Sequence, residues 1–186
     1  MAFIQVIPPD VAEGRLKEIY DDLIRKRGKL AEVHKIQSLH PESIIKHMDL
    51  YMEIMFGKSP LRRYQREMIA VVVSTANQCE YCTIHHAEAL VHFWKDQEQV
   101  DQLIADFNQS SLNSSDLALC QYALALTRRP EEVGIKEVSI LKDSGFDDRA
   151  ILDTALVISY FNFVNRMVLG LGVALEEDGG KGYEYD

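Results

Sequence analysis

The sequence has few cysteines, no excess of basic residues and no segment that reads as a confident β-strand. Its three cysteines are an odd number, and two of them lie in one C-x-x-C pair, which does not resemble the disulfide framework of a small secreted protein. A net charge of −9 and a pI of about 5.1 disfavour binding to a phosphate backbone. We therefore expect no nucleic-acid partner, and a reducing cytoplasm as the compartment.

Two kinds of targeting segment are also missing from the pattern. The stretch MAFIQVIPPD lacks the basic region and apolar run of a secretory signal, and no apolar run of transmembrane length stands out. We expect no association with a membrane. A chain of 186 residues with 47% hydrophobic and 26% charged residues is typical of one globular domain. We divide it into an N-terminal arm and helix (1–40), a core (41–175) and a polar tail (176–186).

Helical periodicity dominates the chain and predicts an all-α fold. Asp10 is the expected cap of the first helix, Gly28 and Gly57 are stops, and Pro41 is a start. The stretch 29–41 is ambiguous and favours a surface loop. The expected helices cover residues 11–27, 41–56, 60–77, 79–94, 96–107, 116–129, 131–144 and 149–169. The Met-rich helix over 41–56 is apolar on more than one side, which is typical of a buried helix or a subunit contact.

The most informative stretch is EMIAVVVSTANQCEYCTIHH, which carries Glu67, Cys79, Cys82 and His86. A helix that starts at Ser59-Pro60 should run up to a corner at residues 77–78, and a second helix should open near Cys79. Cys82 and His86 are four residues apart and share one face of that second helix. If the two helices fold back on each other, Glu67 approaches the His86 ring.

These residue types suit thiol chemistry. A free cysteine has a pKa of about 8.5 and is mostly protonated at neutral pH, whereas the thiolate is the nucleophile. His86 can take the proton of Cys82, and Glu67 can fix the imidazole tautomer and stabilise its cation. We expect a lowered pKa for Cys82. Attack of Cys82 on a peroxide gives a sulfenic acid, which Cys79 converts to a disulfide that a dithiol must reduce.

The spacing E-x11-C-x2-C-x3-H resembles the active-site pattern of alkylhydroperoxidase D-like proteins of the carboxymuconolactone decarboxylase-like superfamily. The resemblance implies that Cys82 attacks the peroxide, that Cys79 resolves the product and is exposed to the reductant, and that Glu67 and His86 relay protons. The stretch from LKDSGF to LGLGV resembles a peroxidase-related subgroup. One position departs from the pattern, since Tyr81 stands where the better-studied members carry a second histidine.

The resemblance also implies an all-helical oligomer, from dimer to hexamer, that reduces a small hydroperoxide with electrons from a lipoyl-type or thioredoxin-like dithiol. No cofactor or metal is expected. Alternatives remain open: a general thiol–disulfide oxidoreductase, a redox-sensing oligomer without turnover, or a lactone decarboxylase-type enzyme, which the C-x-x-C disfavours. Zinc is a further alternative, but C-x2-C-x3-H supplies three ligands and a structural site usually needs four.

Several other residues have a structural and a functional interpretation. Tyr81 either packs or donates a hydrogen bond to the thiolate, and His85 lies either at the surface or at the pocket. Cys120, among Leu and Ala, is expected to be buried and inert. Shifting the sequence by 83 residues lays Cys79 and Cys82 over Asn162 and Asn165. Few positions are identical, but the superfamily resemblance keeps a duplicated helical hairpin open; the two asparagines could also bridge helices.

Overall fold

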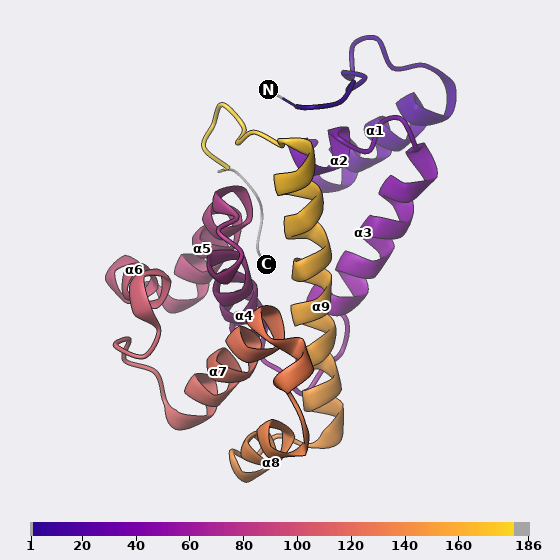
Figure 1. Cartoon of the computed structure of the whole chain (residues 1–186). Coiled ribbons are helices and arrows are strands. Elements are labelled where there is room, and N and C mark those ends of the chain that lie inside the picture. Colours follow the sequence, from indigo (N-terminus) through magenta and orange to yellow (C-terminus); the bar gives the residue numbers. More distant parts are fainter. Residues whose placement is uncertain (1, 181–186) are drawn as a thin grey trace.

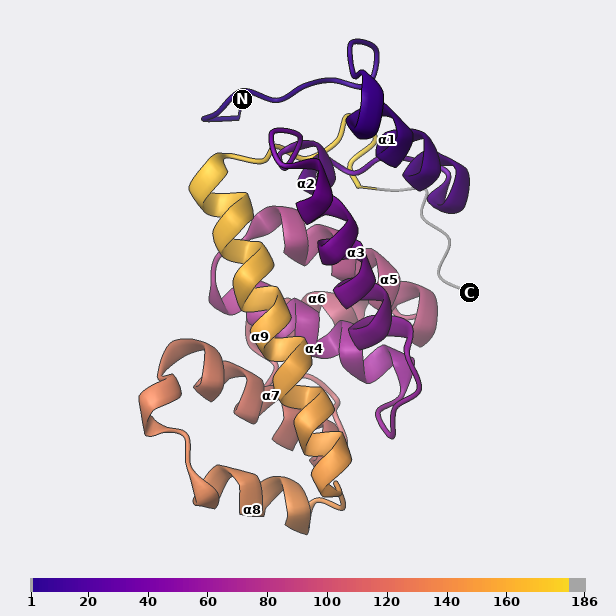
Figure 2. The ribbon, with the colours of Figure 1, turned by 90° about the vertical axis from the view of Figure 1, so that its right-hand side faces the viewer.

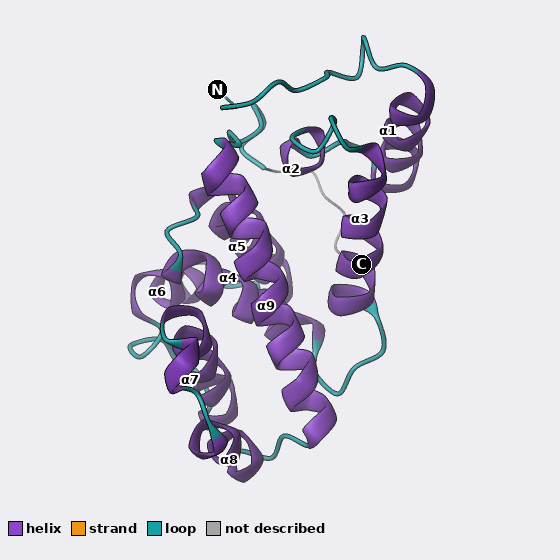
Figure 3. Ribbon diagram, turned by 45° about the vertical axis from the view of Figure 1, so that its right-hand side comes forward, coloured by secondary structure: helices purple, strands orange, loops and turns teal. Residues whose placement is uncertain are grey.

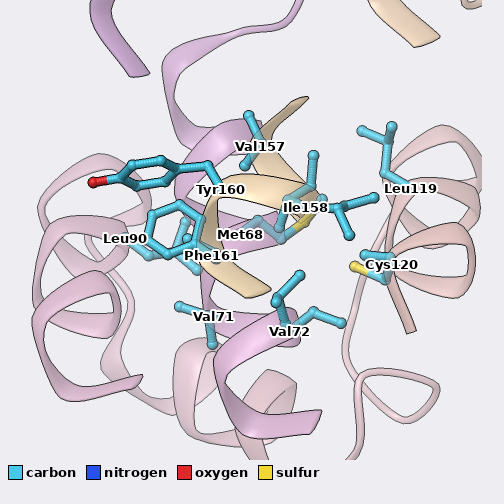
Figure 4. Close-up of a cluster of buried hydrophobic side chains, with 14 of the residues drawn as sticks. Met68, Val71, Val72, Leu90, Leu119, Cys120, Val157, Ile158, Tyr160 and Phe161 are labelled. Carbon is cyan, nitrogen blue, oxygen red and sulfur yellow. The ribbon is translucent and has the colours of Figure 1, made fainter. Parts of the chain in front are cut away.

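Helices form all of the regular structure in residues 2–180, the part of the chain that the computed structural model describes (Figures 1 and 3). Helix α4 (Arg63–Ala76) lies at the centre and is buried along most of its length. Helices α5 (Glu80–Trp94), α7 (Ser114–Arg128) and α9 (Asp148–Leu171) pack against it. Their apolar side chains meet in one core, shown in Figure 4 by Met68, Val72, Leu90, Leu119 and Ile158. Each such side chain contributes about 1.5–3 kcal/mol when fully buried.

The turn before α4 differs from the prediction, because α4 begins at Arg63 and not at Ser59-Pro60. The Ser59 hydroxyl accepts a hydrogen bond from the Leu61 backbone N–H at 3.1 Å and donates one to Asp153 Oδ2 at 2.5 Å. The serine therefore joins this turn to α9 instead of capping α4.

The corner between α4 and α5 lies at Asn77 and Gln78, as predicted. Gln78 has a left-handed backbone conformation with φ of 57°, which turns the chain sharply without a glycine. Cys79 follows as the N-cap of α5, and its backbone N–H donates to the Ser74 carbonyl at 2.9 Å. The corner thus holds Cys79 against the end of α4.

Helix α9 runs the height of the molecule, beside α3 (Pro41–Phe56) in Figure 2. It begins as predicted, because Asp147 accepts a hydrogen bond from the Ala150 backbone N–H at 2.8 Å. The 83-residue shift would require a second corner inside residues 149–166, but α9 is continuous there. The shift therefore aligns the α4–α5 hairpin with the single helix α9, and residues 149–166 do not form the duplicated hairpin.

By length and composition alone, α9 could cross a membrane, which corrects the expectation that no run of that length exists. Its most apolar window is 44% buried within the protein, and the helix packs on α3, α4 and α7. A core helix passes the same test, so this one helix is weak support for a membrane span.

The remaining segments surround this core. Helix α6 (Gln97–Asp106) is capped by Asp96. Helix α7 has Asn113 as its N-cap and begins at Ser114, slightly before the start predicted at residues 115–116. The helix expected from residue 131 is a 3₁₀ turn (Pro130–Glu132) followed by α8 (Ile135–Asp143), because Val133 and Gly134 are extended.

The N-terminal region forms a second, smaller core. Helix α1 (Gly14–Arg27) starts later than predicted, because Val11 closes a turn onto the Pro8 carbonyl and Asp10 caps nothing. Its buried apolar residues pack on α3. The ambiguous stretch 29–41 contains a short helix, α2 (Glu32–Lys35), which becomes part of the wall of the site.

The N-terminal arm lies against the C-terminus of α9 (Figure 1). The Phe3 backbone N–H donates to the Leu171 carbonyl at 2.9 Å, and the Phe3 ring lies against Gly172. The segment 172–180, called the strap below, then returns toward α5. Of the predicted polar tail, residues 181–186 lie outside the described part.

Candidate active site

Glu67 and His86 form the best-defined contact of the site. His86 Nδ1 donates a hydrogen bond to Glu67 Oε2 at 2.5 Å, which is the approach that the hairpin predicts. Glu67 is 1% exposed, and burial by itself raises its pKa. The charges and hydrogen bonds of His86 and Arg63 outweigh that cost and lower the pKa of Glu67 below its usual value. The pair therefore holds a buried carboxylate beside an imidazole whose Nε2 is left for proton exchange.

Arg63 occupies the second oxygen of the same carboxylate. It pairs with Glu67 Oε1 one helical turn along α4, and its guanidinium lies 4.1 Å from the centre of the Phe56 ring. The Glu67 carboxylate thus makes both the helix-internal ion pair and the contact with the histidine. Each contact holds the carboxylate in place for the other.

The two sulfurs lie behind this pair. Cys79 and Cys82 are both free thiols, with exposed fractions of 0% and 2%. The expectation that Cys79 is exposed to the reductant is therefore wrong in this state of the protein. The cause is tertiary: Cys79 belongs to the buried core around α4, and Asn165 of α9 lowers the pKa values of both thiols.

The expectation of a lowered pKa for Cys82 is wrong, because its pKa is raised and it is the pKa of Cys79 that is lowered. The Cys82 thiol donates a hydrogen bond to the sulfur of Cys79, which lowers the pKa of Cys79. The same hydrogen bond stabilises the protonated form of Cys82, and together with burial it raises the pKa of Cys82 well above its ordinary value. The first proton lost from the dithiol therefore comes from Cys79, with Cys82 as its hydrogen-bond donor.

A cavity of about 90 Å³ opens in front of Cys82. Cys82, His86 and Glu67 line it, whereas Cys79 does not. Most of the remaining wall consists of aromatic and histidine side chains, which come from α2, α3, α5 and α9. These side chains are His34, His47, Tyr51, Phe56, Tyr81, His85, Tyr160 and Phe161, and Val33 of α2 lies among them. An apolar cavity of about 150 Å³ accepts benzene, so this cavity suits a smaller molecule.

The strap contacts two residues of the cavity wall, Tyr81 and His85, through Glu176. Its Oε1 accepts hydrogen bonds from the Glu32 backbone N–H at 3.0 Å and from the Tyr81 hydroxyl at 2.7 Å. Its Oε2 lies 3.0 Å from His85 Nε2. Burial would raise the pKa of Glu176, but these partners lower it to about 2. A negatively charged anchor thus ties the strap to α2 and α5.

Tyr81 and His85 both line the cavity, so the interpretation of His85 as a surface residue is wrong. Their rings lie 4.3 Å apart between centroids, and His85 Nδ1 donates to the Tyr81 carbonyl at 2.8 Å. The Tyr81 hydroxyl donates its proton to Glu176 on the strap, so this proton is not donated to a thiolate. Both residues join the cavity wall to its cover.

Sequence reasoning missed several residues of the site, including Glu176, Tyr160 and His47. Glu176 sits in a polar stretch and Tyr160 in an apolar run, so neither pattern marks it. Asn165 carried a weak signal, as a polar residue within an apolar helix. It bridges helices as one interpretation held, because its Oδ1 accepts from Asn77 at 2.9 Å and its Nδ2 donates to Ser74 at 3.2 Å.

Cys120 takes no part in the site. It is fully buried in α7, and burial raises its pKa far above the ordinary range, which agrees with an inert thiol. Within residues 2–180, no three His, Cys, Asp or Glu side chains are grouped so as to hold a metal ion.

Comparisons with known proteins give one family match and several structures of the same fold. Residues 46–106 match the model of the carboxymuconolactone decarboxylase family. A search of curated protein sequences gives no match.

Solved structures share the fold over nearly the whole chain. An uncharacterised peroxidase-related protein with an alkylhydroperoxidase AhpD core, from Ralstonia eutropha JMP134, has a TM-score of 0.86 at 22% identity, covering 96% of this chain and 94% of that one. An uncharacterised peroxidase-related protein from Silicibacter sp. TM1040 has a TM-score of 0.83 at 26% identity, covering 96% and 97%.

A cysteine-to-alanine variant of the debrominase Bmp8, bound to 2,3,4-tribromopyrrole, has a TM-score of 0.79 at 17% identity, covering 95% of this chain and 93% of that one. The family match covers the stretch that carries Glu67, Cys79, Cys82 and His86 but not α2 or α9, and the shared fold covers almost all of the chain. Residues 46–106 are thus similar to the carboxymuconolactone decarboxylase family, and the chain as a whole has the all-α alkylhydroperoxidase D-like fold.

Proposed function

We propose that the protein is a thiol-dependent peroxidase that reduces small hydroperoxides through Cys82 and Cys79. One observation carries the proposal: Cys82 and the hydrogen-bonded pair of His86 and Glu67 line the same largely aromatic cavity, and the thiol of Cys79 lies next to Cys82. A peroxidase-related role agrees with the superfamily and with the names of the structures that share the fold.

The first step requires a thiolate at Cys82. His86 Nε2 accepts the proton of Cys82, while Nδ1–H stays bonded to the Glu67 carboxylate, which stabilises the imidazolium. The thiolate attacks the terminal oxygen of the hydroperoxide, so an S–O bond forms and the O–O bond breaks. Sulfur is oxidised to a sulfenic acid, and the leaving alkoxide takes the proton from His86.

The second step uses Cys79. The Cys79 thiol gives up its proton and its sulfur attacks the sulfur of the Cys82 sulfenic acid, so an S–S bond forms, the S–O bond breaks, and the leaving hydroxide takes up that proton and departs as water. A lipoyl-type or thioredoxin-like dithiol then returns two electrons and two protons by exchange. Because Cys79 is fully buried in this state, we propose that the reductant reaches the disulfide only after a local opening at the corner or the strap.

The size of the cavity favours small substrates. At about 90 Å³ it suits hydrogen peroxide or a short alkyl hydroperoxide better than one with an aromatic ring. The burial of both sulfurs disfavours a general oxidoreductase that acts on protein disulfides. We place the protein in a reducing cytoplasm and propose a homo-oligomer, with no cofactor needed for this chemistry.

The test is dithiol-dependent turnover with a size series of peroxides: hydrogen peroxide, ethyl, tert-butyl and cumene hydroperoxide. Dihydrolipoamide and thioredoxin are compared as reductants, and mass spectrometry follows the Cys79–Cys82 peptide. Cys82→Ser should abolish turnover, whereas Cys120→Ser should not change it. No turnover by the native protein with any peroxide would refute the proposal. The panel includes 2,3,4-tribromopyrrole, whose exclusive reduction would replace the peroxidase assignment by a dehalogenase.

A further inference from the structure

Outside the Cys82–His86–Glu67 set, a chain of polar side chains runs from α2 to the cavity. Gln37 Nε2 lies 2.8 Å from the Val33 carbonyl and 2.8 Å from His47 Nδ1, and Gln37 Oε1 accepts from the Ser43 hydroxyl at 3.3 Å. A carbonyl oxygen only accepts hydrogen bonds, so the amide nitrogen must face Val33. The second N–H of that amide therefore donates to His47 Nδ1.

This contact determines where His47 carries its proton. Because Nδ1 is an acceptor, the neutral ring has its hydrogen on Nε2, which lies 2.6 Å from the Tyr160 hydroxyl oxygen. Burial lowers the pKa of His47 to about 4, so the ring is neutral at physiological pH. His47 Nε2–H donates to Tyr160, and the hydroxyl proton of Tyr160 is not used by His47.

Tyr160 lines the cavity together with Cys82 and His86. Figure 4 shows its hydroxyl directed away from the apolar cluster of which its ring is a part. Among residues 2–180, His47 is the only hydrogen-bond partner of that oxygen. Burial and neighbouring groups raise the pKa of Tyr160 well above its ordinary value, so the phenol remains a donor and does not become a base.

We propose that Tyr160 is the hydrogen-bond donor to the oxygen that leaves when Cys82 attacks a hydroperoxide, and that His47 and Gln37 are the residues that position it. This inference rests on the proposed peroxidase function. The thiolate of Cys82 bonds to the terminal oxygen while the O–O bond breaks and charge develops on the alkoxide. Tyr160 hydrogen-bonds that charge, and the proton itself comes from His86.

The donor also sets a substrate requirement. A ligand must place an oxygen acceptor within reach of Tyr160 while its terminal oxygen faces Cys82, which suits an R–O–O–H group. A preorganised donor to a developing oxyanion is typically worth about 10²–10³ in rate. We expect a smaller effect, about 10- to 100-fold, because an alkoxide is also stabilised by the imidazolium of His86.

The tautomer is tested first, on the full-length protein, by ¹⁵N NMR of its histidine side chains. His47 should carry its proton on Nε2 and leave Nδ1 bare between pH 6 and 8, with the signal assigned by its loss in His47→Gln. Gln37→Leu should allow the Nδ1-protonated form to appear. A native His47 protonated on Nδ1 would overturn the inference, because Tyr160 would then spend its proton on His47 Nε2.

The donor role is tested by two reactions of Cys82 in a Cys79→Ser background. Tyr160→Phe should slow oxidation by hydrogen peroxide about 10- to 100-fold, measured as trapping of the sulfenic acid by dimedone. It should leave alkylation by iodoacetamide within about twofold, because iodide is the leaving group there. The matched control, Tyr122→Phe, removes the hydroxyl of a buried tyrosine of α7, outside the cavity, and should change neither.

These results separate the inference from the proposed function. Equal slowing of both reactions, or of neither, overturns the role of Tyr160 even when the native protein is an efficient peroxidase. A selective loss of peroxide reactivity supports that role even when no dithiol sustains turnover. Failure of Cys82 to react with any peroxide in the native protein overturns both proposals.

Discussion

A substitution at Glu176 tests whether the strap controls access to the cavity. In Glu176→Gln, the amide oxygen can still accept from the Glu32 N–H and the Tyr81 hydroxyl, but the charge that faces His85 at 3.0 Å is lost. Hydrogen bonds to a charged group are worth about 1.5–3 kcal/mol and neutral ones about 1. The change therefore removes about 1–2 kcal/mol from the closed state, which corresponds to an opening about 5- to 30-fold more frequent.

The assay is alkylation of Cys82 by two maleimides of different size, N-methylmaleimide and N-pyrenylmaleimide. Loss of the Glu176 charge also lowers the pKa of Cys82, because that carboxylate raises it in the native protein. A lower pKa accelerates both reagents equally, whereas opening of the strap favours the bulky one. We expect the ratio of the bulky to the small rate to rise about 5- to 30-fold in Glu176→Gln.

Glu177→Gln removes the same charge from the exposed neighbouring residue and serves as the control. An unchanged ratio of the two rates, however fast each becomes, would refute the gating role of the strap. The closed state should also depend on acid. Because the pKa of Glu176 is lowered to about 2, its contribution is complete above the ordinary value of about 4.5 and is lost as pH falls toward 2.

Three further predictions follow from the site and from the surface. Cys82→Ala removes the hydrogen-bond donor of Cys79, so the pKa of Cys79 should rise, read as a shift of its iodoacetamide rate to higher pH; an unshifted curve would contradict the donor assignment. Glu67→Gln leaves Arg63 and His86 without their buried partner and should cost about 3 kcal/mol in urea unfolding, with a loss of peroxidase rate. The apolar stripe of Leu152, Leu156 and Phe163 on α9 is 41–54% exposed, so we expect a homo-oligomer by light scattering that Leu156→Glu dissociates; a monomeric native protein would exclude it.

Contacts of the site between residues close in sequence could be predicted. Contacts between residues far apart in sequence could not. The spacing of Cys82 and His86 is a property of one helix, and the corner at residues 77–78 follows from the chain itself. Glu67 reaches His86 because α4 and α5 fold back on one another over a short connection. Each of these relations involves residues fewer than 20 positions apart.

The corrections involve contacts between distant residues. Cys79 is buried in the core that α4 forms with α9, where Asn165 hydrogen-bonds to Asn77 and Ser74 next to the corner, and no local pattern predicts that contact. The acidity order follows from a hydrogen bond between two sulfurs, whose direction depends on the tertiary surroundings. Glu176 looked like a solvated residue of a polar tail, because only the fold brings Glu32 and Tyr81 to its carboxylate.

The acidity and the access of the two thiols have opposite orders, and this has a consequence for reactivity. Cys79 is the sulfur that loses its proton first, but Cys82 is the one that lines the cavity. Under the proposed function, Cys82 therefore attacks a peroxide only from the state in which its proton has moved to Cys79 or to His86. That state is a minor one at rest, because burial and the Cys79 hydrogen bond both raise the pKa of Cys82.

A ligand that brings an oxygen into the cavity changes this balance. The carboxylate of Glu67 already supports the positive charge of a protonated His86, and an imidazolium beside Cys82 favours its thiolate. When the proton moves to Cys79 instead, Cys79 must lose it again before it can close the disulfide. His86 is the better acceptor, because it leaves Cys79 ionised for the second step. Under the proposed function, the pair of thiols thus rests in a form protected from oxidation, and we propose that the Glu67–His86 pair makes Cys82 reactive when a substrate is bound.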